Sequence, residues 1–576
     1  MKRNILFVIG LLTIGTIISA CNNGDNELST GEGNKKETTQ NLNFEIDFDD
    51  FNTEEEADNT RASRMSEDTL TQEIVDLGNG ILADVTMHRD YTAQTERRTF
   101  TKPTRAIPNE TYTMYVYQGN TLKGSIKGNV AGGVFNPTSA NKVVSLSPGT
   151  YNFVLFNSKV NYVANNLEVP IANALTAMVG YTTQTITATP QQQKVKFRMK
   201  HVGAAVRIQL IADMPIAAGT KGYLSQVSGT TTPNIARQNP MTQSAWGAKS
   251  NANYGGWACE FPTSAQGPFS VASYNSTSTS TAGFLPTTIM KNFEFKFTAG
   301  KIFNTNMANA KIRLNPTPAI TTNPNARYLI RIRLRPDFIY LMSDGSTGGF
   351  KQTRQGGGSK TAIGVVLSTS KKMAIALKDA PHTNYWRQWD AWANTGATEQ
   401  SYSWYLNNYD GWNYTWNPNY TKNRPNGTAA RPRADFDQYA TYAIPTMGHS
   451  CYYAAGYFNP GVTLTGNMTG GKKFYLPTIG EWKYMASMFN YTPVSGAPTS
   501  CLVYRPLVDR AFTQVGGTVP NGDYYSSTEV GTWSFPATAT YNISFKPKNA
   551  AAHELKFVNM GQNVSGVFVR PFIKYP

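Results

Sequence analysis

The densest group of residues that could recognise a ligand lies between Asn384 and Tyr420, where twelve of 37 residues are Trp or Tyr. Asn, Gly and Asp are interleaved with these rings. A flat ring covers the apolar face of a sugar or peptide, while amides and carboxylates bond to its polar groups. The alternative is that the rings form the core of a loop-rich domain, and both interpretations stay open. The candidate ligand-binding residues are Trp404, Tyr409, Asp410, Trp412, Asn413 and Trp416.

Residues with metal-binding or catalytic spacing are absent from the sequence. The five His are scattered, and no CxxC or Cys/His zinc spacing occurs. No Ser/His/Asp or Cys/His arrangement stands in a recognisable catalytic context. We therefore expect no metal, no cofactor and no catalytic residue, and we do not expect an enzyme.

Cysteine use is compatible with export from the cell. The chain has four cysteines, Cys21, Cys259, Cys451 and Cys501. Cys451 and Cys501 lie in the same C-terminal region and are the candidate disulfide. The alternative is that the internal cysteines are buried free thiols.

The N-terminus reads as a targeting segment. Lys2 and Arg3 precede an apolar run, Ile5 to Ile18, which is too short for a comfortable membrane span and is typical of a signal peptide. The small residues before Cys21 resemble a bacterial lipobox, in which Cys21 becomes the lipidated first residue of the mature protein. An ordinary secretory signal is the alternative. We expect residues 1–21 to form a lipoprotein signal segment whose cleavage leaves Cys21 as the first residue, and we expect the lipid on Cys21 to anchor the chain to the outer membrane at the cell surface.

The net charge of +16 is distributed unevenly along the chain. Residues 1–21 carry +2 and residues 22–58 carry −10, so the remainder carries +24. We interpret residues 22–65 as an acidic tether, because they contain too few apolar residues to fold alone. Within the tether, Phe44, Ile46 and Phe48 alternate like a strand that could pair with a sheet.

The positive charge of the remainder does not indicate nucleic acid. The segment Tyr328 to Leu334 alternates apolar and basic residues, which is typical of a strand with one solvated face. An exported chain also occupies the wrong compartment for a nucleic-acid partner. We therefore exclude nucleic acid as a partner.

Residues 66–336 carry β-strand patterns throughout. Tyr112, Met114 and Val116 alternate with polar residues, and so do Val195, Phe197 and Met199. Turn residues recur every 8–12 positions, which is typical of antiparallel sandwiches. We predict one β-sandwich over residues 66–190 and a second over residues 191–336.

The composition changes after residue 336, where eight of the ten Trp lie. Pro477 ends a short strand, Thr478 suits a helix N-cap, and Glu481 three residues later completes a capping box. The strand, turn and helix predict an α+β domain over residues 337–576.

Two pairs of segments carry a resemblance to a known family. Thr104–Pro108 followed by Thr111–Tyr117, and Val195–His201 followed by Ala204–Ile208, resemble the N-terminal and second domains of fimbrillin-family lipoproteins of Bacteroidetes. The lipobox and the order along the chain agree with this resemblance. It implies a mainly β chain with two tandem transthyretin-like β-sandwiches.

The resemblance also implies assembly by a donor strand. A protease removes an N-terminal strand after an Arg, and a strand from another pilus subunit takes its place. The candidate cleavage sites are Arg61, Arg64, Arg98 and Arg105, and the sequence does not choose among them.

The C-terminal segment carries a second resemblance. Leu476–Trp482, Tyr524–Glu529 and Val569–Pro571 resemble the C-type-lectin-like domains related to formylglycine-generating enzymes. The resemblance implies an α+β C-type-lectin-like fold without the enzyme activity, because the enzymes use two cysteines close together near their C-terminus. Cys451 and Cys501 lie 50 residues apart, and no calcium-sugar motif of the Glu-Pro-Asn or Gln-Pro-Asp kind is present.

These features predict a fimbrial accessory or tip subunit with a C-terminal adhesive domain. The expected partners are other pilus subunits, a host or bacterial surface protein or glycan, and the outer membrane through the lipid. The alternative is a freestanding cell-surface lipoprotein that binds glycans.

Overall fold

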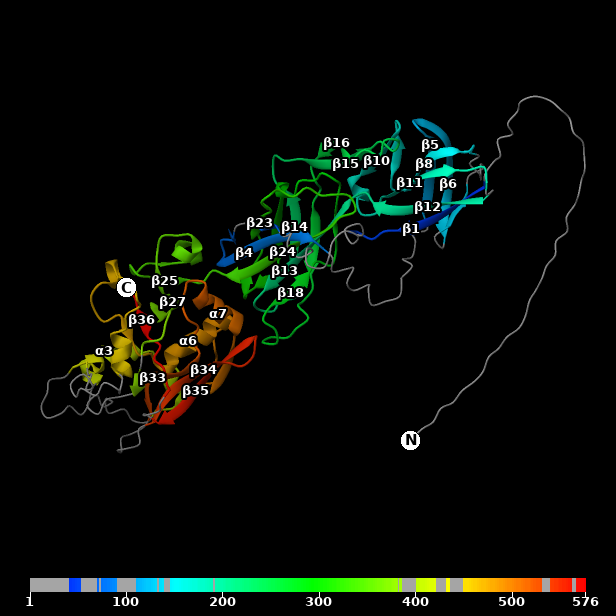
Figure 1. The fold of residues 1–576 in the computed structure, drawn as a ribbon. Coiled ribbons are helices and arrows are strands. Elements are labelled where there is room, and N and C mark those ends of the chain that lie inside the picture. The colour runs from blue at the N-terminus through cyan, green and yellow to red at the C-terminus, as the bar shows by residue number, and fades with distance from the viewer. Residues whose placement is uncertain are drawn as a thin grey trace, which may run out of the picture.

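The computed structural model describes residues 41–52, 70–71, 74–90, 110–131, 134–138, 146–189, 192–381, 383–385, 400–420, 431–435, 449–530, 539–561 and 566–576. Strands dominate, so the prediction of a mainly β chain is confirmed. Three bodies follow one another along the molecule, with the N-terminal barrel and the helix-containing C-terminal module at opposite ends (Figure 1). Within the described residues, no helix is both long and apolar enough to cross a membrane.

The first body is a closed barrel, whereas the prediction for residues 66–190 was a β-sandwich. Alternating apolar residues point inward, and Tyr112, Met114, Val195 and Met199 are fully buried, as their period-two pattern predicts. Around the barrel the strands are β1 (Asn41–Phe48), β12 (Gln192–His201), β11 (Met178–Ile186), β8 (Gly149–Asn157), β5 (Thr111–Gln118), β6 (Thr121–Ala131) and β7 (Val134–Pro137).

The second body is a sandwich of two sheets. Fully buried Val206, Ile208 and Leu210 of one sheet and Phe295 and Phe297 of the other share a core. The first sheet contains β18 (Tyr274–Thr277), β13 (Ala204–Ala212), β24 (Arg327–Pro336), β4 (Ile81–Arg89) and β2 (Leu70–Thr71), with β19 (Ala282–Phe284) and β3 (Val75–Asp76) beside it. The second sheet contains β17 (Trp257–Phe261), β14 (Thr220–Gln226), β20 (Phe293–Ala299) and β23 (Lys311–Arg313), and β21 (Lys301–Ile302) pairs with β22 (Thr305–Asn306).

Strand β4 corrects the predicted boundary between the two sandwiches. The prediction placed residues 66–190 in the first body, but β4 pairs with β24 along its whole length, from Ile81 opposite Pro336 to Arg89 opposite Tyr328. The buried side chains of β4 complete the core of the second sandwich. A strand pattern shows which face is buried but not which partner it pairs with, so the sequence could not reveal this crossing.

A small sheet joins the first two bodies. It contains β9 (Asn161–Val163), β10 (Asn166–Pro170), β15 (Thr232–Gln238) and β16 (Gly247–Ala252), with η3 (Ile171–Asn173) following β10. The buried carboxylate of Glu168 on β10 lies 2.6 Å from Arg237 on β15 and 2.7 Å from Lys249 on β16. The ion pairs hold the two segments together.

The C-terminal module combines helices and sheets, as an α+β domain over residues 337–576 requires. Its larger sheet contains β26 (Thr347–Gly348), β25 (Tyr340–Met342), β27 (Ala362–Ser368), β28 (Met373–Ala376), β36 (Phe572–Lys574) and β31 (Phe474–Tyr475). Its second sheet contains β32 (Ser500–Tyr504), β35 (Ala552–Gly561), β34 (Ala539–Pro547) and β33 (Gly522–Val530), and β29 (Thr383–Tyr385) pairs with β30 (His449–Ser450). The helices are α2 (Tyr402–Tyr405), α3 (Gly411–Trp416), α5 (Cys451–Gly456), α6 (Ile479–Asn490) and α7 (Arg505–Thr513). Short 3-10 turns of the module lie at Phe350–Gln352, Arg354–Gly356, Pro418–Tyr420, Arg433–Asp435 and Gly466–Met468, and another lies at Met290–Asn292 in the second sandwich.

The second sandwich and the C-terminal module share one continuous core. Phe269 stacks on Tyr504 with ring centroids 4.3 Å apart. The Arg510 guanidinium on α7 donates to the buried Asp213 carboxylate at 3.0 Å. A buried charge pair and a shared apolar core fix these two bodies relative to each other.

The predicted capping box at the start of α6 is confirmed. The Thr478 hydroxyl accepts from the Glu481 N–H, and the Thr478 N–H donates to the Glu481 carboxylate at 2.8 Å. The Tyr475 hydroxyl donates to the same carboxylate at 3.0 Å. Burial raises the pKa of Glu481 from 4.5 to about 7 in spite of these hydrogen bonds.

The raised pKa of Glu481 makes the stability of the module depend on pH. Between pH 4.5 and about 7 the folded carboxyl keeps a proton that the unfolded chain has lost, so stability falls as pH rises. The full effect is about 3 kcal/mol. Glu481→Gln keeps a capping-box residue but cannot titrate, so the variant should gain stability relative to wild type between pH 4 and pH 8, measured by urea unfolding.

The exposed Glu260→Gln serves as the control and should show no such gain. A stability difference between wild type and Glu481→Gln that stays constant from pH 4 to pH 8 would contradict the assignment.

Candidate functional site

Strand β1 closes the barrel between β12 and β7. Its eight residues pair in parallel with β12, from Asn41 opposite Gln192 to Phe48 opposite Met199. On its other edge β1 meets β7 at one register position, Glu45 opposite Val134. We call the position between β12 and β7 the β1 site. One edge of β1 is therefore fully paired, and the other is joined at a single position.

The side chains of β1 complete the barrel core. Phe44 and Ile46 are buried, and the Phe44 ring lies edge-on to Phe135 and tilted against Phe153 and Phe197. Removing β1 would expose the apolar faces of those rings to water, which is unfavourable. The barrel therefore needs an apolar strand in the β1 site.

The outer face of the β1 site is basic and complements the acidic tether. Glu45 lies 2.7 Å from Lys194 and 3.4 Å from Lys196. The Asp49 carboxylate, just after β1, accepts from Arg198 at 2.7 Å and is itself buried. The hydrogen bond from Lys194 lowers the pKa of Glu45. Part of the predicted tether is thus an ordered strand with charge partners on β12.

Several predicted site residues lie outside the described part of the chain. These are the lipidation residue Cys21 and the candidate cleavage residues Arg61, Arg64, Arg98 and Arg105. The aromatic residues Trp386, Trp389 and Trp392 also lie outside it.

The aromatic candidates of residues 404–416 divide into exposed and buried members. Trp404 on α2 is 44% exposed, whereas Trp416 at the end of α3 is 4% exposed and its indole N–H donates to the Phe474 carbonyl at 2.7 Å. Trp412 is half-buried and donates to the Lys472 carbonyl at 2.7 Å. Trp416 is therefore a core residue, and its prediction as a ligand-binding residue is wrong.

The polar candidates bond mainly to one another. The Asn413 amide donates to the Asp410 carboxylate at 2.7 Å, and the Tyr420 hydroxyl donates to the other carboxylate oxygen at 3.3 Å. Tyr409 packs edge-on against Tyr484, and Lys371 lies 5.0 Å from the Tyr409 ring centroid. Asp410 and Asn413 thus order the loop between α2 and α3, and Tyr409 remains half-exposed beside it.

A shallow pocket of about 30 Å³ lies beside Trp404. At its base the buried Arg433 guanidinium lies 2.6 Å from Glu529. Burial would lower the pKa of Arg433, but the nearby Glu529 charge raises it, so the pair is ionic. The buried Ser527 hydroxyl has no hydrogen-bond partner in the described structure. The lining residues are Trp404, Tyr405, Asn408, Tyr414, Arg433, Ser527, Thr528 and Glu529.

This pocket can accept one polar group of a ligand that lies across the surface. Its volume is near that of a single water molecule, so it cannot enclose a sugar ring. Sequence reasoning from the aromatic run missed Ser527 and Glu529, although both belong to the Tyr524–Glu529 segment that carries the lectin-like resemblance. Arg433 carried no sequence signal.

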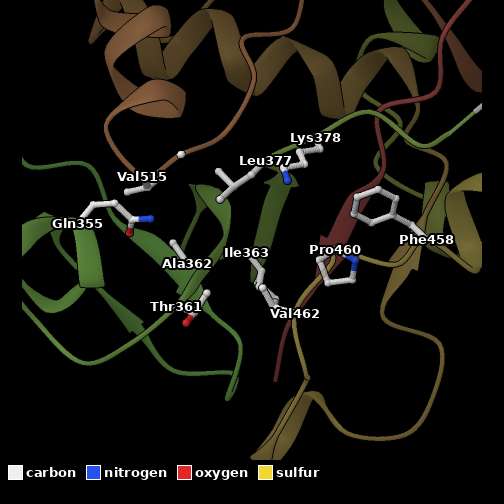
Figure 2. Close-up of a pocket in the computed structure, with 11 residues that line it drawn as sticks. Gln355, Thr361, Ala362, Ile363, Leu377, Lys378, Phe458, Pro460, Val462 and Val515 are labelled. Carbon is white, nitrogen blue, oxygen red and sulfur yellow. The ribbon is translucent and has the colours of Figure 1, made fainter.

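A larger cavity of about 170 Å³ lies elsewhere in the module (Figure 2). Its walls are mostly apolar, and the exposed Lys378 at the rim has no ion pair within the described residues. None of the aromatic candidates lines it, so it is separate from the pocket beside Trp404. The lining residues are Gln355, Thr361, Ala362, Ile363, Leu377, Lys378, Phe458, Pro460, Val462, Val515 and Gly516.

No disulfide joins the described cysteines Cys259, Cys451 and Cys501, so the candidate Cys451–Cys501 disulfide is not formed. Cys451 begins α5 inside one apolar cluster of the module, whereas Cys501 lies on β32 against a different cluster. Burial raises the pKa of both thiols, which keeps them protonated.

Comparisons with known proteins give only distant likenesses. No protein-family model and no curated protein matches the chain. A fimbrial protein from Bacteroides ovatus matches 81% of this chain and 94% of its own length at 10% identity and a TM-score of 0.24. A fimbrial assembly protein from Parabacteroides distasonis matches 40% of this chain and 86% of its own at 9% identity and 0.22.

A third solved structure is a candidate cell adhesion protein from Bacteroides uniformis. It matches 41% of this chain and 95% of its own length at 13% identity and a TM-score of 0.29. Likenesses this weak assign neither a fold nor a function to the chain.

Because Trp416 is buried and Trp404 is exposed, substitutions of the two should change stability by very different amounts. Trp416→Ala should destabilise the module by about 3–5 kcal/mol, because it leaves a cavity and an unpaired carbonyl. Trp404→Ala should change stability by less than about 0.5 kcal/mol, because the ring is exposed. Urea unfolding of the two variants measures the difference. Equal destabilisation by both substitutions would show that Trp404 is also a core residue.

Proposed function

We propose that the chain is an accessory or tip subunit of a surface pilus, assembled by donor-strand addition, and that its C-terminal module binds the adhesive ligand. The observation that carries the proposal is the placement of β1. An N-terminal strand completes the barrel from a position with one fully paired edge. A strand from another subunit with the same apolar alternation could complete the same core.

The position of β4 reduces the number of candidate cleavage residues. Arg61 and Arg64 lie between β1 and β2 in the sequence, so a cut there separates β1 from the rest of the chain and leaves the second sandwich intact. A cut at Arg98 or Arg105 would also detach β4, which pairs with β24 over nine residues inside the second sandwich. Arg61 or Arg64 is therefore the favoured site.

The same cut changes how the subunit is attached. Cys21, the proposed lipid-bearing residue of an outer-membrane lipoprotein, precedes β1 in the sequence. Cleavage at Arg61 or Arg64 therefore disconnects the folded subunit from its membrane anchor at the moment when the β1 site becomes available. The role is assembly and binding, not catalysis.

The C-terminal module supplies the ligand-binding end. It lies at the end of the molecule opposite the barrel (Figure 1), so a subunit joined through the β1 site presents the module away from that junction. Exposed Trp404 lies beside the unpartnered Ser527 hydroxyl, an arrangement that suits a glycan or a peptide. The freestanding glycan-binding lipoprotein is the second candidate, because it needs only this surface.

Peptide exchange tests the proposal. The full chain, with a site-specific protease sequence in place of residues 61–64, is cut and mixed with a labelled peptide of residues 41–52. The peptide should replace β1. An Ile46→Asp peptide should bind roughly a hundredfold more weakly, because it places a charge in the barrel core.

The matched control is an Asn43→Asp peptide, which adds the same acid at an exposed position of β1 and should bind like the wild-type peptide. If no peptide enters the cut chain, strand addition is wrong. Retention of the uncut chain on a polysaccharide, lost in Trp404→Ala, would then support the second candidate.

A further inference from the structure

The segment that follows β1 does not end at the barrel. It continues as Asp49–Asn52, which we call the junction segment, and leads from the barrel toward the second sandwich (Figure 1). The Asp49 N–H donates to the Met199 carbonyl at 2.9 Å, which extends the β1–β12 pairing by one residue. A strand that fills the β1 site and runs in this direction is thus delivered to the boundary between the two bodies.

Phe51 covers the end of β12. Its ring is stacked on His201 with centroids 3.9 Å apart and planes 6° apart, and both side chains are buried. On the second sandwich, the Arg327 guanidinium lies 5.4 Å from the Phe51 ring centroid. The ring therefore contacts the last residue of a barrel strand and the first residue of β24.

Asn52 ties the junction segment to the second sandwich. Its carboxamide oxygen accepts from the Arg327 N–H at 2.7 Å, and its amide donates to the Asp90 carbonyl at 3.0 Å. The Asn52 N–H donates to the Asn325 carbonyl at 2.7 Å. The residue is 3% exposed. These bonds give hydrogen-bond partners to backbone groups at the start of β24 and just after β4.

Asn325, next to the second sandwich, makes similar carboxamide hydrogen bonds to the barrel and to the junction segment. Its carboxamide oxygen accepts from the His201 N–H at 3.2 Å, and its amide donates to the Asp50 carbonyl at 3.4 Å. Asn52 and Asn325 both have positive φ, 69° and 54°, a conformation that Asn and Gly adopt at least cost. Position 52 therefore requires a residue that adopts a positive φ and carries a carboxamide, and Asn meets both needs.

From this geometry we infer that the partner segment that enters the β1 site is an acidic strand followed by an aromatic residue and an Asn, which lock it into the second sandwich. The inference rests on the proposed function and names the chemistry of its partner. The strand has apolar residues at the positions of Phe44 and Ile46 and acids facing Lys194 and Arg198. The aromatic residue and the Asn stand three and four residues after the strand's last residue, Phe48.

We call the aromatic residue and the Asn, at the positions of Phe51 and Asn52, the lock. The lock couples insertion of the partner strand to the second sandwich. Among the described strands β1 pairs only with β12 and β7 of the barrel, whereas Asn52 contacts the ends of β4 and β24. A segment that has the strand but not the lock leaves the groups around Arg327 and Asp90 without the carboxamide. Such a segment fills the barrel and binds less tightly.

The test compares two peptides with the same chemical change. On the cut chain described above, a peptide of residues 41–52 with Asn52→Ala should dissociate about tenfold faster than the wild-type peptide, because the carboxamide hydrogen bonds to Arg327 and Asp90 are lost. The peptide with Asn43→Ala, at an exposed strand position, should dissociate at the wild-type rate. Equal dissociation of the two variants overturns the lock and leaves strand addition in place, whereas failure of every peptide to bind overturns strand addition itself.

The uncut chain gives a second measurement. Asn52→Ala should speed hydrogen exchange at the amides of β1, and Asn43→Ala should not. If Asn52→Ala changes exchange only next to Arg327 and leaves β1 as in wild type, the lock does not hold the strand, and the inference is wrong.

Discussion

The parallel pairing of β1 with β12 is the interaction on which the N-terminal half of the molecule depends. It places Phe44 and Ile46 in the barrel core and brings an acidic segment onto a basic strand. It also delivers Asp49–Asn52 to the boundary with the second sandwich. Because β1 precedes every other described strand in the sequence, a cut between β1 and β2 separates it from the rest of the protein without breaking another described strand.

The second sandwich and the C-terminal module form one rigidly connected unit. The second sandwich and the C-terminal module share a continuous core and the buried Arg510–Asp213 pair. The surface around Trp404 therefore has a fixed position relative to the second sandwich. This arrangement suits a subunit that is joined to its neighbours at one end and binds its ligand at the other.

The sequence predicted the local features of the fold well. The alternation in β5 and β12, the capping box at Thr478 and Glu481, and the strand character of residues 44–48 follow from short-range patterns, and all appear in the structure. Pairing partners were not predictable. Assigning β4 to the second sandwich requires knowing that Ile81–Arg89 meets β24, which is almost 250 residues away along the chain.

The candidate site shows the same limit. Trp404 and Trp416 have the same residue type and similar neighbours in the sequence, yet one is exposed and the other lies in the core. The junction contacts of Phe51 and Asn52 had no sequence signal, because they depend on His201, Asn325 and Arg327 meeting at one place in the fold.

A reversible cross-link between β1 and β12 tests the central claim most directly. Glu45 and Lys196 are register partners with exposed side chains, so Glu45→Cys with Lys196→Cys can form a disulfide at little cost in stability. After cleavage between β1 and β2, the account predicts that the oxidised chain stays out of pili and that the reduced chain enters them. Equal incorporation of the oxidised and reduced chains into sheared, purified pili would contradict it.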